Sequence, residues 1–248
     1  MPLIIAPVEL PDFDAIIAHA DIYEPGDDLV APPNPVAWPV ATQAEAQERL
    51  RLLMGRQRQR FLEDPTARFM KVVDVAGSYS PTTSDDPMEP ISKFIPQGDI
   101  IAIARWHSFP KGYSFDSMSH WEVATLPHNQ AEWPPNFNQP LHDFILLSRD
   151  RARASWIPAG QPAWVLMHLV TRSSQRGRGA AGMLIRWGIE QSEREGTPAY
   201  LEAGVQGKPI YEKYGFRQVG QGVKLDLSSV GKPGVVFEMA NMVRRPGR

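Results

Sequence analysis

The stretch Gln175-Arg-Gly-Arg-Gly-Ala-Ala-Gly182 lies between an apolar run and an amphipathic run. Residues 163–171, before it, are apolar at nearly every position, which predicts a strand buried on both faces. The residues after it carry apolar or small side chains at helical spacing, which predicts a helix to about Glu195. Glycines at such a junction let backbone N–H groups approach a ligand, and the helix start adds unpaired donors. The stretch therefore predicts an anion site, most often one for phosphate.

The composition favours a soluble globular protein. The chain has 248 residues, of which 42% are hydrophobic and 22% charged, with a formal net charge of -2 and no cysteine. The charge gives no basis for nucleic-acid or membrane binding, and the lack of cysteine excludes disulfides and thiolate zinc sites. No apolar run is long enough to span a bilayer, and the first residues lack the basic start of a signal peptide. Because the histidines show no metal-ligand spacing, no metal site is expected. The lack of a signal peptide and of a spanning segment leads us to expect a cytoplasmic location.

The rest of the pattern predicts alternating strands and helices. Strands are expected at residues 3–6, 68–75, 100–106, 163–171, 199–203, 216–225 and 235–243. Helices are expected at residues 12–20, 43–63, 140–156 and 209–214, besides the one that follows the glycine stretch. Prolines recur in residues 77–98 and 108–139, so both are expected to be irregular insertions. The chain is expected to form a single domain over residues 1–248, with 68–75 and 100–106 as antiparallel neighbours.

Two phosphate-binding motifs compete for the glycine stretch. Residues Gly177–Gly182 match G-x-G-x-x-G, and Glu202 follows about twenty residues later, as in dinucleotide-binding folds. Against this, residues 172–176 separate the strand from the first glycine, and too few residues follow Glu202 to complete a doubly wound sheet. A P-loop is excluded because no Lys-Ser/Thr pair follows the glycines. The dinucleotide fold is thus an alternative that the sequence disfavours.

The second motif has a companion further along the chain. Arg176-Gly-Arg-Gly179-Ala-Ala181 has the form R-x-x-G-x-A, and Ile210-Tyr-Glu-Lys-Tyr-Gly-Phe216 contains Y-x-x-x-G-F on a short helix leading into a strand. In this order and spacing, the two motifs resemble the GNAT N-acetyltransferase superfamily. Residues 169–216 look most like its fungal single-domain members. The resemblance covers the C-terminal third of the chain.

The resemblance implies an α/β fold whose mixed central sheet is splayed at its middle strand, here residues 163–171, with helices on both faces. Acetyl-CoA would lie in the opening. Backbone N–H groups of the glycine stretch would hold its pyrophosphate, with charge-assisted contacts from arginine side chains. The backbone of the middle strand would pair with the pantetheine arm and polarise the thioester carbonyl. The expected acetyl-CoA site comprises Leu169, Val170, Thr171, Arg176, Gly177, Arg178, Gly179, Ala180 and Ala181.

Catalytic roles are also carried over from the family. Tyr211 matches the general acid that protonates the departing CoA thiolate, and its alternative is a tyrosine that packs the last helix against the sheet. The general base stays open between His168, Glu202, His107 and a chain of waters. Tyr214 is expected to be a core residue. The arginine-rich helix at 43–63 is expected to be amphipathic, with its arginines in solvent.

Taken together, the motifs predict transfer of an acetyl group from acetyl-CoA to an amine, by direct attack in a ternary complex. The acceptor is expected to be a small molecule or a peptide, and the sequence does not select between them. The alternative from another class is a GNAT-fold module that binds CoA without catalysis. Neither the oligomeric state nor the role of the two insertions follows from the sequence.

Overall fold

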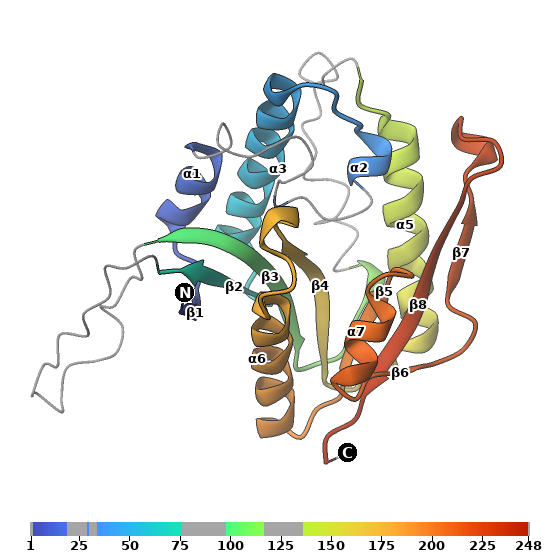
Figure 1. Cartoon of the computed structure of the whole chain (residues 1–248). Helices are drawn as coiled ribbons and strands as arrows, with labels where there is room; N and C mark the ends of the chain where they lie inside the picture. Colours follow the sequence, from blue (N-terminus) through green and yellow to red (C-terminus); the bar gives the residue numbers. More distant parts are fainter. Residues whose placement is uncertain (1, 19–28, 30–33, 76–97, 117–135, 248) are drawn as a thin grey trace, which may run out of the picture.

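The computed structural model describes residues 2–18, 29, 34–75, 98–116 and 136–247 (Figure 1). Its strands are β1 (Leu3–Pro7), β2 (Ala67–Asp74), β3 (Asp99–Phe109), β4 (Ala163–Thr171), β5 (Ala199–Ala203), β6 (Arg217–Gln218), β7 (Val223–Asp226) and β8 (Val236–Arg244). Its α-helices are α1 (Leu10–Ala18), α2 (Asn34–Ala37), α3 (Gln43–Glu63), α5 (Gln139–Trp156), α6 (Ala180–Arg194) and α7 (Lys208–Lys213). Two 3₁₀ helices lie in the described residues, η4 (Ser173–Gln175) and η5 (Ser228–Val230).

The strands form one sheet in the order β1-β2-β3-β4-β5-β8-β6, with β7 paired to β8. Strands β4 and β5 are parallel and joined through α6, whereas the other pairs among the described strands are antiparallel. The expected antiparallel pairing of β2 with β3 is confirmed, and so is the mixed α/β fold. A dinucleotide-binding fold needs a mostly parallel sheet, so that alternative is wrong. The expected single domain over residues 1–248 is a proposal that the single sheet supports.

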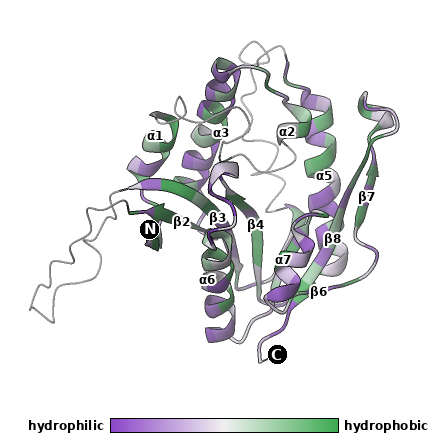
Figure 2. Cartoon of the chain, viewed as in Figure 1, coloured by the Kyte–Doolittle hydropathy of each residue, from purple (hydrophilic) through white to green (hydrophobic). Residues whose placement is uncertain are grey.

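Helices cover both faces of the sheet because successive strand residues point to opposite sides. Met70 faces a core cluster that includes Leu184 and Ile185 of α6. Its neighbour Phe69 faces a second cluster, which contains Phe13 of α1. Figure 2 shows the consequence along the chain, with β3 and β4 largely hydrophobic and the helices striped. The central strands are therefore buried on both faces, as the apolar run at 163–171 predicted.

Several expected boundaries need correction. The strand expected at 216–225 is two strands, β6 and β7, because Gly220 and Gly222 between them adopt positive φ angles of 60° and 77°. Strand β3 continues to Phe109, into the range expected to be an insertion. The rest of the two expected insertions lies largely outside the described residues. On α3, Arg49 and Arg60 are only 3% and 4% exposed, so the expectation that its arginines lie in solvent is wrong for these two.

The contact between α6 and β3 gives a stability prediction. Gly188 of α6 lies against the indole of Trp106, and a Cβ atom there would overlap the ring. We expect Gly188→Ala to destabilise the protein by about 1–3 kcal/mol through overpacking, measured by denaturant unfolding. Gly55, in the middle of α3, is the matched control because nothing lies within 4 Å of the Cβ it would gain. Gly55→Ala should stabilise the protein by about 0.5–1 kcal/mol, and equal effects at both positions would contradict the packing argument.

Candidate functional site

The sheet opens between its two parallel strands. Pairing between β4 and β5 runs through Trp164 with Ala199, Val165 with Tyr200 and Leu166 with Leu201. Within the described strands it ends there, although β4 continues to Thr171 and β5 to Ala203. One backbone edge of residues 167–171 therefore lacks a partner strand, and the five residues are all partly exposed. This is the splay at the middle strand that the resemblance implied.

A bulge in β4 lies where the two strands separate. Arg105 of β3 pairs with His168, whereas the next residue, Trp106, pairs with Leu166. Met167 is thus an extra residue on β4 without a partner on β3. A bulge bends its strand and increases the local twist. The bulge thus coincides with the end of the pairing between β4 and β5.

Beyond the bulge, the expected site residues of β4 keep their pairing with β3. Leu169, Val170 and Thr171 lie opposite Ala104, Ile103 and Ala102. Leu169 packs against the core cluster under α6, and Val170 packs against the cluster under α1 and α3. The side chains of Leu169 and Val170 therefore pack into the two cores, which leaves their backbone for the opening.

The glycine stretch follows β4 directly, after the turn η4. Gly177 and Gly179 have φ angles of 80° and 90°, a region that favours glycine, and Gly179 is the N-cap of α6. A Cβ atom on either glycine would meet nothing within 4 Å. Among the described residues, the backbone N–H groups of 177–182 have no acceptor. The stretch therefore presents a row of free donors and the positive end of a helix to open space.

The two arginines of this stretch differ. Arg178 donates to Asp74 at the end of β2, with an Nη1–Oδ2 distance of 2.6 Å, and also to Gln175. The hydrogen bond from Arg178 lowers the pKa of the Asp74 carboxyl below its ordinary value. Arg176 is exposed, and its side chain makes no hydrogen bond or ion pair with another described residue. Arg176 is thus the one whose guanidinium is available to a ligand, while Arg178 ties the loop to β2.

The two tyrosines of the second motif pack against the same core but differ in what their hydroxyls contact. Tyr211 of α7 is partly buried against the core under α6, with its ring edge-on to Phe216 at 6.0 Å between centroids. Burial raises the pKa of its phenol above the ordinary value, and its hydroxyl bonds to no other described residue. Tyr214 packs against the same core, and its hydroxyl accepts from Arg186 at 3.4 Å. Tyr211 therefore retains its proton and has an unused donor.

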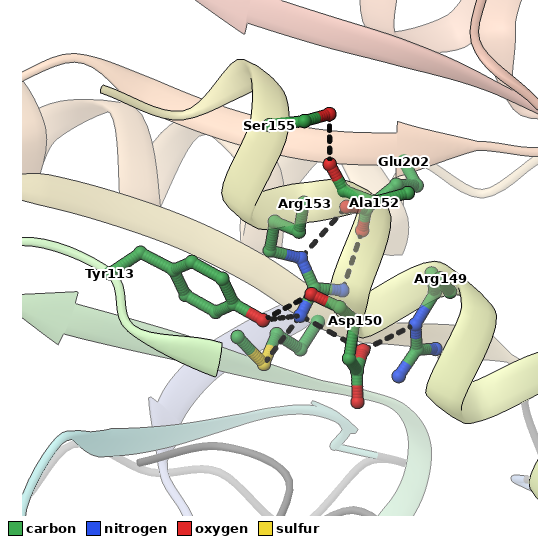
Figure 3. A network of polar contacts seen from close by, with 8 residues as sticks. Tyr113, Arg149, Asp150, Ala152, Arg153, Ser155 and Glu202 are labelled. Atoms are coloured by element: carbon green, nitrogen blue, oxygen red, sulfur yellow. Dashed lines mark hydrogen bonds and ion pairs between the residues drawn. The ribbon is translucent and has the colours of Figure 1, made fainter. Parts of the chain in front are cut away.

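Glu202, considered above as a base, has a buried arginine as its partner (Figure 3). Arg153 of α5 donates from Nε to Oε1 at 2.7 Å and from Nη2 to Oε2 at 2.8 Å. Both carboxylate oxygens are thus engaged, and the two side chains are 0% and 3% exposed. Although burial alone would lower the pKa of Arg153, the charges of Glu202 and Asp150 raise it well above its ordinary value. Both oxygens of Glu202 therefore face Arg153 and are not presented to an acceptor amine.

The two histidines lie at different levels of the sheet. His107 pairs with Val165, in the half of β4 that is still bonded to β5, and its side chain is fully buried. Its Nδ1 lies 2.8 Å from the hydroxyl of Thr66. His168 directly follows the bulge, beyond the last β4–β5 pair, and is partly exposed. Of these two, His168 is the one beside the opening.

Known proteins were compared with this chain in both sequence and structure. No protein-family model matches the chain. Two solved structures align with nearly all of it. One is a Corynebacterium glutamicum protein described as histone acetyltransferase HPA2 and related acetyltransferase, with 17% identity and a TM-score of 0.51 over 100% of this chain and 98% of that one. The other is mosquito arylalkylamine N-acetyltransferase like 5b, with 12% identity and a TM-score of 0.55 over 98% of this chain and 100% of that one. The chain has the GNAT fold. A curated relative, the probable acyltransferase SID5 of Ajellomyces capsulatus, is 32% identical over 84 residues, which are 33% of this chain and 60% of the relative.

The GNAT resemblance expected from the two motifs is therefore confirmed, and the fungal relative agrees with its expected branch. The sequence did not single out Arg153, the partner of Glu202, or Tyr113, which contacts Arg153. A signal was present, because Arg149, Asp150 and Arg153 fall on an otherwise apolar face of a helix. Charged residues on a buried face of a helix are rarely tolerated without partners. In the described part of the chain, no helix is long and apolar enough to cross a membrane, and no group of three side chains is placed to hold a metal ion.

Proposed function

We propose that the protein transfers an acetyl group from acetyl-CoA to an amine, by direct attack within a ternary complex. The proposal rests on one observation, which is that an unpaired strand edge and a row of free N–H groups follow each other along the chain. The unpaired edge of β4 leads, through η4, into the free N–H groups of residues 177–182. A pantetheine arm needs the first feature and a pyrophosphate needs the second, and acetyl-CoA joins the two chemically.

Different groups of the protein bind the different parts of acetyl-CoA. The N–H groups of 177–182 and the guanidinium of Arg176 bind the pyrophosphate, with Arg178 fixing the loop through Asp74. The backbone of residues 169–171 pairs with the pantetheine arm and polarises the thioester carbonyl, which stabilises charge that develops during attack. Tyr211 donates a proton to the departing thiolate. Acetyl-CoA supplies the activated acetyl group.

For the base, the geometry favours His168 over the other candidates. Glu202 is occupied by Arg153, and His107 is buried beside the paired half of β4. An imidazole beside the opening is of the kind that accepts a proton from an amine. In His168→Asn, the low-pH limb of kcat/KM should change, and an unaltered pH profile would leave a chain of waters as the acceptor of the proton.

The acceptor is an amine on a small molecule or a peptide. The solved relative from mosquito is an arylalkylamine N-acetyltransferase in name, which is consistent with an amine acceptor but does not select one.

Binding and turnover test the proposal together. Isothermal titration with acetyl-CoA should show one site per chain with an affinity in the micromolar range typical of such substrates. Release of free CoA, followed with a thiol reagent across pools of small amines and peptides, should then identify acceptors. Binding without turnover on any pool would favour the alternative, a CoA-binding module without catalysis. Lack of acetyl-CoA binding would overturn both.

A further inference from the structure

Arg153 touches both strands at the level where they separate. The last β4–β5 pair is Leu166 with Leu201, and the next residues are Met167 and Glu202. From α5, Arg153 holds the Glu202 carboxylate through Nε and Nη2, and its Nη1 lies 3.9 Å from the sulfur of Met167. Its guanidinium thus bridges the bulge of β4 and the end of β5, where the pairing between the two strands stops. Figure 3 shows the part of this contact that Arg153 makes with Glu202.

The remaining contacts of Arg153 are with Asp150 of its own helix and with Tyr113, in the segment after β3. Its Nη1 lies 3.1 Å from Oδ1 of Asp150, and its Cζ lies 5.3 Å from the ring centroid of Tyr113. The Tyr113 hydroxyl donates to the backbone carbonyl of Asp150 at 2.9 Å, and Arg149 donates from Nε to Oδ1 of Asp150. Arg153 is fully buried, and two arginines face two carboxylates, so the group is neutral as a whole.

The contacts of Arg153 with Glu202 and Met167 fix the distance between β4 and β5. A planar guanidinium that holds both oxygens of one carboxylate has a fixed geometry, unlike the flexible ammonium of lysine. The bulge bends β4, and Arg153 fixes where β5 lies relative to that bend. Arg153 thus joins α5 to both strands at this level.

We propose that Arg153 is a positioning residue that sets the width of the opening between β4 and β5, and so the fit of the pantetheine arm of acetyl-CoA. The proposal rests on the proposed function, because it assigns that arm to the opening. It assigns no role to Arg153 in binding the pyrophosphate, which the loop at 177–182 holds from the other end of β4. Arg153 should therefore affect one half of the ligand and spare the other.

The effect of Arg153 on each half of CoA can be measured with two ligands. Acetyl-CoA contains both the pantetheine arm and the pyrophosphate, whereas 3′-phosphoadenosine 5′-diphosphate contains the diphosphate without the arm. Glu202→Gln keeps the shape of the side chain and removes the charge that Arg153 holds. Arg153→Lys keeps the charge but cannot bridge two oxygens. In both variants we expect affinity for acetyl-CoA to fall by about tenfold or more, since small misplacements are costly, with little change for the diphosphate.

A second buried ion pair provides the matched control. Lys71 of β2 lies 2.6 Å from both carboxylate oxygens of Asp12 on α1, with the two side chains 2% and 12% exposed. Asp12→Asn makes the same chemical change as Glu202→Gln, in a pair that does not touch β4 or β5. It should lower the melting temperature by a similar amount and leave the affinity for both ligands close to the parent's.

Loss of a single charge from a buried pair can unfold a protein, so a double variant extends the test. Replacing a buried ion pair by apolar residues of similar volume is often neutral for stability. Arg153→Met combined with Glu202→Leu should thus remain folded, lose the fixed separation, and bind acetyl-CoA more weakly while keeping the diphosphate.

The outcomes separate the inference from the function on which it rests. A parent protein that binds the diphosphate but not acetyl-CoA would overturn the proposed function. If the parent binds both, folded variants that bind acetyl-CoA as the parent does would overturn the role of Arg153 alone. An equal loss of both ligands, or unfolding of every variant including the double one, would also overturn it, because the network would then serve the fold as a whole.

Discussion

Tyr211→Phe is expected to lower kcat by about 10²- to 10⁴-fold, the usual contribution of general acid catalysis. The substitution removes the hydroxyl that we propose as proton donor and keeps the ring that packs on Phe216. Affinity for acetyl-CoA should stay within a few-fold of the parent. Turnover with a saturating acceptor, titration with acetyl-CoA and thermal unfolding on the same two proteins measure the three quantities.

The structure makes this substitution a clean test. The Tyr211 hydroxyl bonds to no other described residue, so its removal leaves no buried partner unsatisfied and should leave the melting temperature unchanged. Burial raises the pKa of the phenol, so the group stays protonated through the neutral range and keeps its proton available. Raising the pH to the ordinary range of a tyrosine should therefore not remove the donor.

Tyr214→Phe is the control, because Tyr214 lies in the same motif but its hydroxyl accepts from Arg186. Its kcat should stay close to that of the parent. A tyrosine that only packs the helix would give the opposite pattern at position 211, with normal turnover. That result would remove Tyr211 from the mechanism and leave solvent as the proton source.

Local features of the structure were predictable because their causes are local. An apolar run predicted β4 with its observed bounds, residues 163–171, since a strand with helices on both faces needs apolar side chains on both. Glycines after it predicted the turn, and Gly177 and Gly179 have the positive φ angles that only glycine adopts readily. Helix α3 was predicted with its observed bounds for the same kind of reason, a long apolar stripe.

Pairings between distant residues were not predictable, because no local pattern encodes them. Arg178 reaches Asp74 across 104 positions of sequence, and Glu202 reaches Arg153 across 49. The same is true of the bulge at Met167, which appears only when β4 is laid against β3. Two side chains that looked available for phosphate binding or proton transfer, Arg178 and Glu202, are therefore engaged elsewhere. The conformation of the glycine loop depends on local sequence and was predicted, whereas these side-chain pairings were not.

Gly179→Val is the substitution expected to weaken acetyl-CoA binding most. Gly179 has a φ angle of 90°, and the space that its Cβ would enter contains no protein atom within 4 Å. A valine would therefore meet no protein neighbour there. It would instead occupy the space in which we propose the pyrophosphate lies and disfavour the backbone angle that aims the N–H groups. Losing two hydrogen bonds to a charged group, at about 1.5 kcal/mol each, corresponds to roughly 100-fold weaker binding.

Gly196 separates the loss of a ligand site from simple backbone strain. It lies just beyond the other end of α6, has a φ angle of 63° and also has open space at its Cβ position. Gly196→Val should thus carry a similar strain of about 1–3 kcal/mol, seen in thermal unfolding, without weakening acetyl-CoA binding. Because the two variants share their strain and differ in position, their difference in affinity measures the loop alone. Equal affinities for acetyl-CoA in both variants would mean that the pyrophosphate is held elsewhere, since the free N–H groups at 177–182 would then have no role in binding.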